Sequence, residues 1–283
     1  MTIKLVGIVG AGTMGNGIAQ ACAVAGIDAL MLDVNPAALE KGLATISGSL
    51  DRLVKKEKIT AEIRAAAVAR VKTTSTLADL AACDYVIEAA TENEALKIKI
   101  LTNLDAALKP ETIIATNTSS ISITQLAAAT QRPDRFVGMH FFNPVPMMAL
   151  VELIRGLATS DATIATAQAL ANALGKTPIT VKNSPGFVVN RILCPMINEA
   201  IFCLQEGLAT AEDIDAGMKL GTNQPIGPLA LADMIGLDIM IAVMNVFYEG
   251  FNDPKYRPAP LLKEMVAAGY LGRKTGRGFY IYA

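Results

Sequence analysis

The stretch "GIVGAGTMGNG", residues 7–17, constrains the fold more than any other part of the chain. It places Gly10, Gly12 and Gly15 in GxGxxG spacing between an apolar run typical of a strand and a pattern typical of a helix. The first glycine of such a motif permits a tight turn, the second lets backbone approach a pyrophosphate, and the third lets helix and strand pack closely. The spacing therefore predicts a dinucleotide-binding turn, which also includes Thr13 and Met14.

Asp33 ends the next apolar run, about 20 residues after the glycines, where such folds carry an acidic residue. Its carboxylate would accept hydrogen bonds from both ribose hydroxyls and would repel a 2′-phosphate, so NAD is favoured over NADP. The alternative is a glycine-rich turn with an unrelated helix-capping aspartate.

Short apolar runs alternate with longer helical patterns in the first part of the chain. This alternation predicts an α/β fold, a Rossmann-type doubly wound and mostly parallel sheet with helices on both faces. The predicted strands cover residues 4–10, 28–34, 84–90, 112–116, 135–141 and 177–182. One helix is predicted from the glycine motif to about residue 26, and another begins at residue 93. Further helices are predicted across 36–70 and 161–174.

The pattern changes near residue 184, after which apolar residues recur at helical spacing. Ser184 is a suitable N-cap and Pro185 suits a first helical position. We therefore expect an NAD-binding domain over 1–183 and an all-helical domain over 184–283. Its predicted helices are 186–206, 210–220, 228–250 with a break near Gly236, and 259–268.

The composition, 52% hydrophobic with a formal net charge of −1 over 283 residues, is that of a two-domain globular protein. It does not point to nucleic acid or to an anionic membrane. Residues 5–27 are uncharged, as in a signal peptide, but six of them are glycine. We expect a soluble cytoplasmic protein.

The four cysteines form no CxxC pair and no metal-like cluster, so the sequence predicts reduced thiols and no metal site. Cys194 and Cys203 are nine residues apart in a helical pattern, face opposite sides and cannot bridge.

Two predicted strands end in polar clusters, "TIIATNTSS" and "VGMHFFNP". Ligands bind at the carboxyl ends of strands in an open parallel sheet, so Asn117, Ser119, His140 and Asn143 could face one crevice. A capped turn before the helix near Ile123 is the alternative for the first cluster.

His140 is the only histidine of the chain. A lone histidine in an apolar strand is usually a satisfied core residue, but redox chemistry on an alcohol requires a group that moves the hydroxyl proton. Glu152, in an apolar run, should be either exposed or paired. If paired with His140, it would fix the imidazole tautomer and stabilise the imidazolium. The basic stretch "RLVKKEK", residues 52–58, is either a solvated helix end or a clamp for phosphates.

Together the motifs resemble the 3-hydroxyacyl-CoA dehydrogenase family, particularly its short-chain bacterial 3-hydroxybutyryl-CoA branch. The resemblance spans essentially the whole chain and is carried by "GAGTMGNGIAQ", "ATENEALKIKI", "NTSSISI", "GMHFFNPVPMM", "SPGFVVNRIL", "IGPLALADMIGLD" and "LGRKTGRGFY". It implies a stand-alone NAD-dependent oxidoreductase for (S)-3-hydroxyacyl-CoA, with 3-hydroxybutyryl-CoA and acetoacetyl-CoA as the expected pair. It also implies a homodimer formed through the helical domain.

The resemblance further implies residue roles. His140 is the expected catalytic base and Glu152 its orienting partner, while Ser119 and Asn190 donate to the C3 oxygen of the substrate. The expected cofactor positions beyond the glycine turn are Asp33, Glu92, Lys97, Asn117 and Asn143. The expected contacts to the CoA substrate, besides Ser119, Asn143 and Asn190, are Ser49 and Lys56.

Two rival functions are compatible with the predicted fold. One is a non-catalytic NAD-binding protein, which would have no chemical need for the set His140, Glu152, Ser119 and Asn190. The other is a dehydrogenase for a small free hydroxy acid, which would have no need of Lys56.

Overall fold

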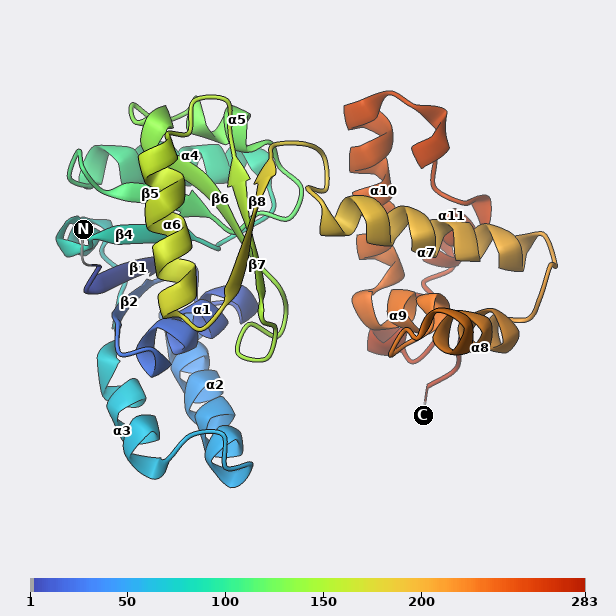
Figure 1. Ribbon diagram of the computed structural model, residues 1–283, viewed down its shortest axis with the longest axis horizontal. Coiled ribbons are helices and arrows are strands. Elements are labelled where there is room, and N and C mark those ends of the chain that lie inside the picture. The colour runs from blue at the N-terminus through green and yellow to red at the C-terminus, as the bar shows by residue number, and fades with distance from the viewer. Residues whose placement is uncertain (1–2, 283) are drawn as a thin grey trace. The chain divides into compact units, whose positions relative to one another are not determined.

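The structure is a computed structural model that describes residues 3–282. The chain divides into two compact units between Ser184 and Pro185 (Figure 1).

The first unit is built on one eight-stranded sheet in the order β3-β2-β1-β4-β5-β6-β7-β8. Every neighbouring pair is parallel except β6 with β7. This confirms the predicted mostly parallel α/β fold, although β3 and β7 lie outside the predicted strands. The strands are β1 (Leu5–Val9), β2 (Asp28–Leu32), β3 (Val71–Thr74), β4 (Tyr85–Glu88), β5 (Ile113–Thr116), β6 (Phe136–Phe141), β7 (Leu150–Arg155) and β8 (Thr177–Lys182).

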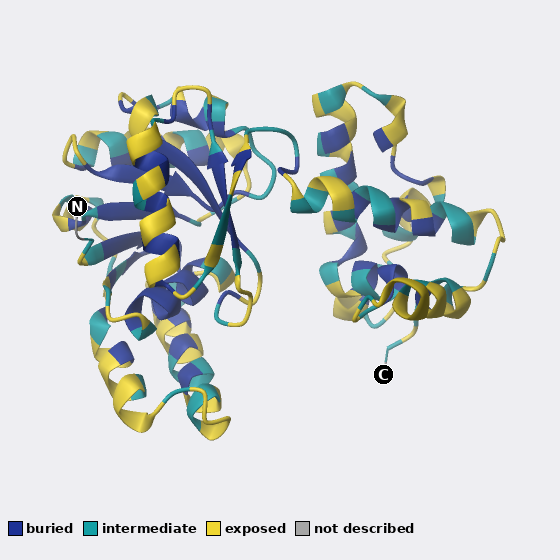
Figure 2. Ribbon diagram, viewed as in Figure 1, coloured by how far each residue is buried: buried dark blue, intermediate teal, exposed yellow. Residues whose placement is uncertain are grey.

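Helices cover both faces of this sheet, as the alternation of side chains along the strands requires. On one face Ile8, Val137 and Leu153 share a hydrophobic cluster with Ile18 of α1 and Ala167 of α6. The intervening strand residues point to the other face, which α4 and α5 cover. The central strands are buried, whereas the edge strands β3 and β8 and the outer helix surfaces are partly exposed (Figure 2). The helices of this unit are α1 (Thr13–Val24), α2 (Pro36–Lys55), α3 (Ala61–Arg70), α4 (Glu94–Ala107), α5 (Ile123–Ala127) and α6 (Asp161–Ala173), with 3₁₀ turns at Leu77–Ala82 and Pro133–Arg135.

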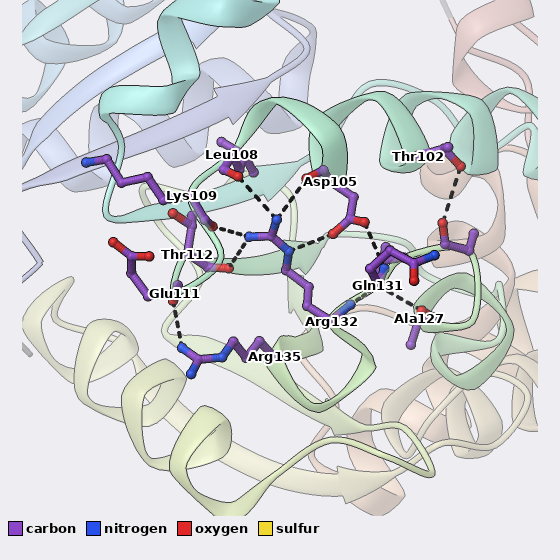
Figure 3. Close-up of polar contacts among 12 residues, drawn as sticks. Thr102, Asp105, Leu108, Lys109, Glu111, Thr112, Ala127, Gln131, Arg132 and Arg135 are labelled. Carbon is purple, nitrogen blue, oxygen red and sulfur yellow. Dashed lines mark hydrogen bonds and ion pairs between the residues drawn. The ribbon is translucent and has the colours of Figure 1, made fainter.

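Arg132 connects the end of α4 to the start of β6 (Figure 3). Its guanidinium donates to Asp105 Oδ1 at 2.6 Å and to four backbone carbonyl oxygens, those of Asp105, Leu108, Lys109 and Thr112. The Arg132 and Asp105 side chains are 10% and 9% exposed. A cation at a helix carboxyl end is favourable, and losing one partner of a buried pair costs about 3–5 kcal/mol, so this contact is a strong anchor for β6.

The second unit consists of helices with 3₁₀ turns at Pro254–Tyr256 and Arg273–Thr275. Its helices are α7 (Val189–Gln205), α8 (Ala211–Thr222), α9 (Pro228–Ile235), α10 (Leu237–Phe251) and α11 (Pro260–Ala267). Gly236, with φ +106°, separates α9 from α10, as the sequence predicts.

The first helix of the second unit was predicted to have Ser184 as its N-cap and Pro185 as its first residue. This prediction is wrong, because α7 begins at Val189. Gly186 and Phe187 have φ of +72° and +54°, and this left-handed backbone cannot continue into a right-handed helix.

Two buried aspartates organise the polar interior of the second unit. Asp215 accepts from the N–H groups of Leu229 and Ala230 at the start of α9. Asp233, 1% exposed, accepts from the N–H groups of Phe279 and Tyr280 and from the hydroxyl of Tyr282. These contacts attach residues 279–282 to α9.

No single helix within residues 3–282 has the length and hydropathy to cross a membrane. Helices α9 and α10 have the length and hydropathy of a membrane span only when they are taken together, and the chain bends by 99° between them.

All four cysteines are free thiols, as predicted. Burial raises the pKa of Cys22, Cys83 and Cys194 to about 12, so these three are poor nucleophiles.

Candidate active site

The glycine turn joins β1 to α1 and has the steric properties that a dinucleotide requires. Gly10 has φ +103°, and a Cβ there would lie 2.7 Å from the carbonyl oxygen of Ala89. A Cβ on Gly15 would lie 1.8 Å from the carbonyl oxygen of Gly10, whereas one on Gly12 would meet nothing within 4 Å. Gly10 and Gly15 thus permit close packing within the protein, and Gly12 keeps the backbone open to a ligand. The first turn of α1 has no side-chain cap, so its N–H groups can receive an anion.

Asp33 lies beside this turn because β1 and β2 are parallel neighbours with Val9 opposite Leu32. Its Oδ2 accepts from the N–H of Ala11 at 2.9 Å, and its Oδ1 accepts from the N–H of Asn35 at 2.9 Å. The carboxylate is therefore held at the turn by two backbone donors, in the place where a ribose would follow a pyrophosphate.

His140 and Glu152 form a hydrogen-bonded pair, with Nδ1 of the imidazole 2.7 Å from Oε2 of the carboxylate. They face each other directly in the antiparallel register of β6 with β7, and opposed residues project from the same face of a sheet. His140 is 6% exposed and Glu152 is 0% exposed. An ionised carboxylate can only accept, so pairing with an ionised Glu152 would place the proton of a neutral His140 ring on Nδ1.

Asn117 and Ser119 follow β5, next to β6 in the sheet. The Asn117 side-chain oxygen accepts from the N–H of Phe141 at 2.9 Å and so joins the ends of both strands. The carboxylate of Glu92 accepts from the hydroxyl of Thr118 and from both the N–H and the hydroxyl of Ser119. Glu92 thus orients the loop that carries Ser119.

The remaining predicted residues of the first unit differ in burial and in the element that carries them. Lys97 on α4 is buried and paired with Glu88, whereas Asn143 is exposed in the β6–β7 connection. Ser49 and Lys56 lie seven residues apart along α2 and its C-cap, which places them on one side of the helix.

The predicted residues divide between the two units. In the first unit, the glycine turn, Asp33, Asn117, Ser119 and His140 lie at or just after the carboxyl ends of β1, β2, β5 and β6, and Glu152 lies opposite His140 on β7. Asn190 lies in the second unit, in the first turn of α7. Glu88 and Thr116 are not among the predicted residues, although a glutamate that ends an apolar strand is a signal of a buried polar contact.

These features define an NAD-dependent dehydrogenase with a separate helical unit. The chain belongs to the 3-hydroxyacyl-CoA dehydrogenase family, since residues 5–184 match the family's NAD-binding domain and residues 186–282 match its C-terminal domain. The family resemblance, the enzyme class and the cofactor predicted from the sequence are thereby confirmed.

Several relatives are similar over their whole length. The 3-hydroxybutyryl-CoA dehydrogenase of Bradyrhizobium diazoefficiens is 56% identical over 280 residues, which cover 99% of this chain and 96% of that protein. A probable 3-hydroxybutyryl-CoA dehydrogenase of Bacillus subtilis is 52% identical, over 100% of this chain and 98% of that one. The crystal structure of (S)-3-hydroxybutyryl-CoA dehydrogenase from Ralstonia eutropha matches with a TM-score of 0.98 at 68% identity, covering 100% of both chains.

Replacing Asp33 with Ser should narrow the preference for NADH over NADPH by roughly ten- to a hundredfold, since a hydrogen bond to a charged group contributes about 1.5 to 3 kcal/mol. The measurement is the dissociation constant for each cofactor by fluorescence titration. Asp28→Ser, at the other end of β2, is the control and should leave the ratio unchanged. An unaltered ratio in the Asp33 variant would remove Asp33 from the cofactor site.

Proposed function

We propose that the chain interconverts (S)-3-hydroxybutyryl-CoA and acetoacetyl-CoA with NAD, and that His140 is the general acid and base. The names of the relatives support the substrate. The buried hydrogen bond between His140 and Glu152 is the observation that carries the assignment of the base.

Bound NAD supplies the acceptor for the hydride that leaves C3 of the hydroxyacyl group. Nε2 of His140 takes the proton of the C3 hydroxyl in the same step. Nδ1 keeps its proton because it donates to Glu152, whose carboxylate stabilises the imidazolium that forms. In the reductive direction the imidazolium returns its proton to the C3 oxygen.

Ser119 and Asn190 are proposed to donate to the C3 oxygen. The Ser119 hydroxyl lies 3.2 Å from Oε1 of Glu92, so the loop is already held at its backbone while the hydroxyl can turn towards a substrate. A donor to an oxygen whose charge changes during reaction would stabilise the transition state more than the ground state.

The direct test of the proposed reaction is the loss of NADH absorbance when protein, NADH and acetoacetyl-CoA are mixed. Turnover supports the proposal. Bound NADH without turnover would instead indicate a non-catalytic NAD-binding protein on the same fold.

His140→Gln should lower kcat by about 10² to 10⁴, the usual contribution of general acid-base catalysis, while the variant still binds NADH. Glu152→Gln should cause a loss of the same kind, because an amide can orient the imidazole but cannot stabilise its cation. The double variant should be little worse than the poorer single variant, since the two residues act as one unit.

Steady-state kinetics with acetoacetyl-CoA, circular dichroism and NADH titration together check this prediction. A folded, NADH-binding His140→Gln protein with wild-type turnover would overturn the assignment and leave His140 a core residue.

Lys56→Ala should raise KM for acetoacetyl-CoA and leave kcat nearly unchanged, since a remote clamp binds ground and transition states alike. The effect should weaken with salt, because the Lys56 side chain is exposed. Lys55→Ala is a matched control, since the neighbouring side chain points about 100° further round the helix. Equal KM values for the wild type and the Lys56 variant at low ionic strength would show that Lys56 is only a solvated residue.

We also propose a homodimer formed through the second unit. Ile192, Met234, Ile239 and Tyr248 of this unit are between 45% and 67% exposed, which is a large apolar area for helices to leave in water. Light scattering at micromolar concentration should give twice the chain mass. Ile239→Asp should weaken the dimer, whereas Leu157→Asp, at a 90% exposed position of the first unit, should not. A monomeric wild type would refute the dimer.

A further inference from the structure

The loop that carries Ser119 is anchored at both ends. It begins after β5 and ends at Ile123, the first residue of α5. At the near end, Glu92 accepts from the N–H and the hydroxyl of Ser119. At the far end, the side chain of Asn183 makes two contacts. Its Oδ1 accepts from the N–H of Ile123 at 2.8 Å, and its Nδ2 donates to Oγ of Ser122 at 3.1 Å. Asn183 therefore holds the end of the loop opposite Glu92.

Asn183 is itself held by the sheet. It follows β8 directly, and its N–H donates at 3.0 Å to the carbonyl oxygen of Arg155, the last residue of β7. Its side chain contacts residues 60 and 61 positions earlier in the chain. The contact is therefore a tertiary one, which joins the edge of the sheet to the start of α5.

The chain after Asn183 leads to Asn190, the other proposed donor. Gly186 lies against α10, since a Cβ there would be 2.1 Å from Cε1 of Phe247. The carbonyl oxygen of Gly186 accepts from the N–H of Arg191 at 3.2 Å. The first turn of α7, which contains Asn190, is therefore attached to Gly186.

Asn183 and Gly186 are only three residues apart in the chain. Consecutive Cα atoms are about 3.8 Å apart, so these two attachment points are separated by at most about 11 Å. The loop that carries Ser119 is bound to the first point, and the helix that carries Asn190 is bound to the second. One short stretch of chain thus connects the two groups that are proposed to donate to the C3 oxygen.

We propose that Asn183 is a positioning residue for the reaction. It holds the Ser119 loop to the stretch of chain that leads to Asn190, so that both donors reach the C3 oxygen together. The inference rests on the proposed function, since it takes Ser119 and Asn190 as the donors. Displacing a reacting group by about 1 Å can cost roughly a hundredfold in rate, so such a tether affects turnover without touching the substrate.

Asn183→Leu removes both contacts and should lower kcat for acetoacetyl-CoA roughly ten- to a hundredfold. KM should stay nearly unchanged, because loss of an interaction made only in the transition state lowers kcat and kcat/KM equally. The dissociation constant for NADH should also stay unchanged, since the glycine turn and Asp33 are untouched. Asn183→Ala replaces the leucine variant if the latter does not fold.

Asn183→Asp is the conservative variant. Its carboxylate can accept from the N–H of Ile123 and from the hydroxyl of Ser122, so this variant should retain most of the wild-type kcat. Recovery with aspartate supports the proposal. An aspartate variant as slow as the leucine variant would overturn it, since the two hydrogen bonds would then not account for the loss.

A double-mutant cycle with Ser119→Ala decides whether Asn183 acts through Ser119. If it does, the protein with both changes should be little slower than the slower single variant. Losses that multiply, or an Asn183→Leu protein that is less stable but has wild-type kcat, would overturn the proposal while the donor role of Ser119 stands. Wild-type kcat in Ser119→Ala is a distinct result, because it would refute that donor role and this inference with it.

Ser160→Ala is the matched control, because Ser160 caps α6 by accepting from the N–H of Thr163 at 3.2 Å, much as Asn183 accepts from the first residue of α5. It should lower the thermal midpoint by roughly 2 to 4 °C and leave kcat unchanged. Equal losses of kcat in Ser160→Ala and Asn183→Leu would show a general effect of stability and would overturn the proposal.

Discussion

Antiparallel pairing of β6 with β7 places the Glu152 carboxylate directly opposite the His140 imidazole. Side chains alternate along a strand, so a slip of one residue in this register would send Glu152 to the opposite face of the sheet. The loop that connects β6 to β7 is held by Lys176, whose Nζ donates to the carbonyl oxygens of Val145 and Met148. Arg132 anchors the other end of β6. The site thus depends on a register that contacts at both ends of the strand maintain.

The predictions that succeed are those with local physical causes. The glycine spacing, the strand that ends at Asp33 and the alternation of strand and helix each depend on residues close in sequence, and the fold follows from them. The pairing of His140 with Glu152 could not be predicted from residue spacing, because the eleven intervening residues must turn and no local pattern fixes how. The start of α7 is predicted wrongly for a related reason. A good capping residue cannot reveal that Gly186 and Phe187 adopt left-handed backbone.

Charged residues illustrate the same limit. Composition suggests that a lysine in a helix such as α4 is solvated, and only the fold shows that Lys97 points to a glutamate at the end of β4. The face on which both lie is set by strand alternation, since Ile87 and Ala115 belong to the hydrophobic cluster of the opposite face. The same alternation directs His140 and Glu152 to that side. One face of the sheet therefore carries the buried charges, and the other carries the apolar contacts with α1 and α6.

The contacts of Asp233 have a consequence for the order of events during synthesis. Its carboxylate is satisfied by Phe279, Tyr280 and Tyr282, which follow it by 46 to 49 residues. While the chain is still on the ribosome, the first unit can complete its sheet as soon as β8 has emerged, because all its strands precede residue 183. The second unit cannot, since the carboxylate would be buried without its donors. Its folding is therefore unfavourable until residues 279–282 leave the exit tunnel, and until then its apolar helices cannot be fully buried.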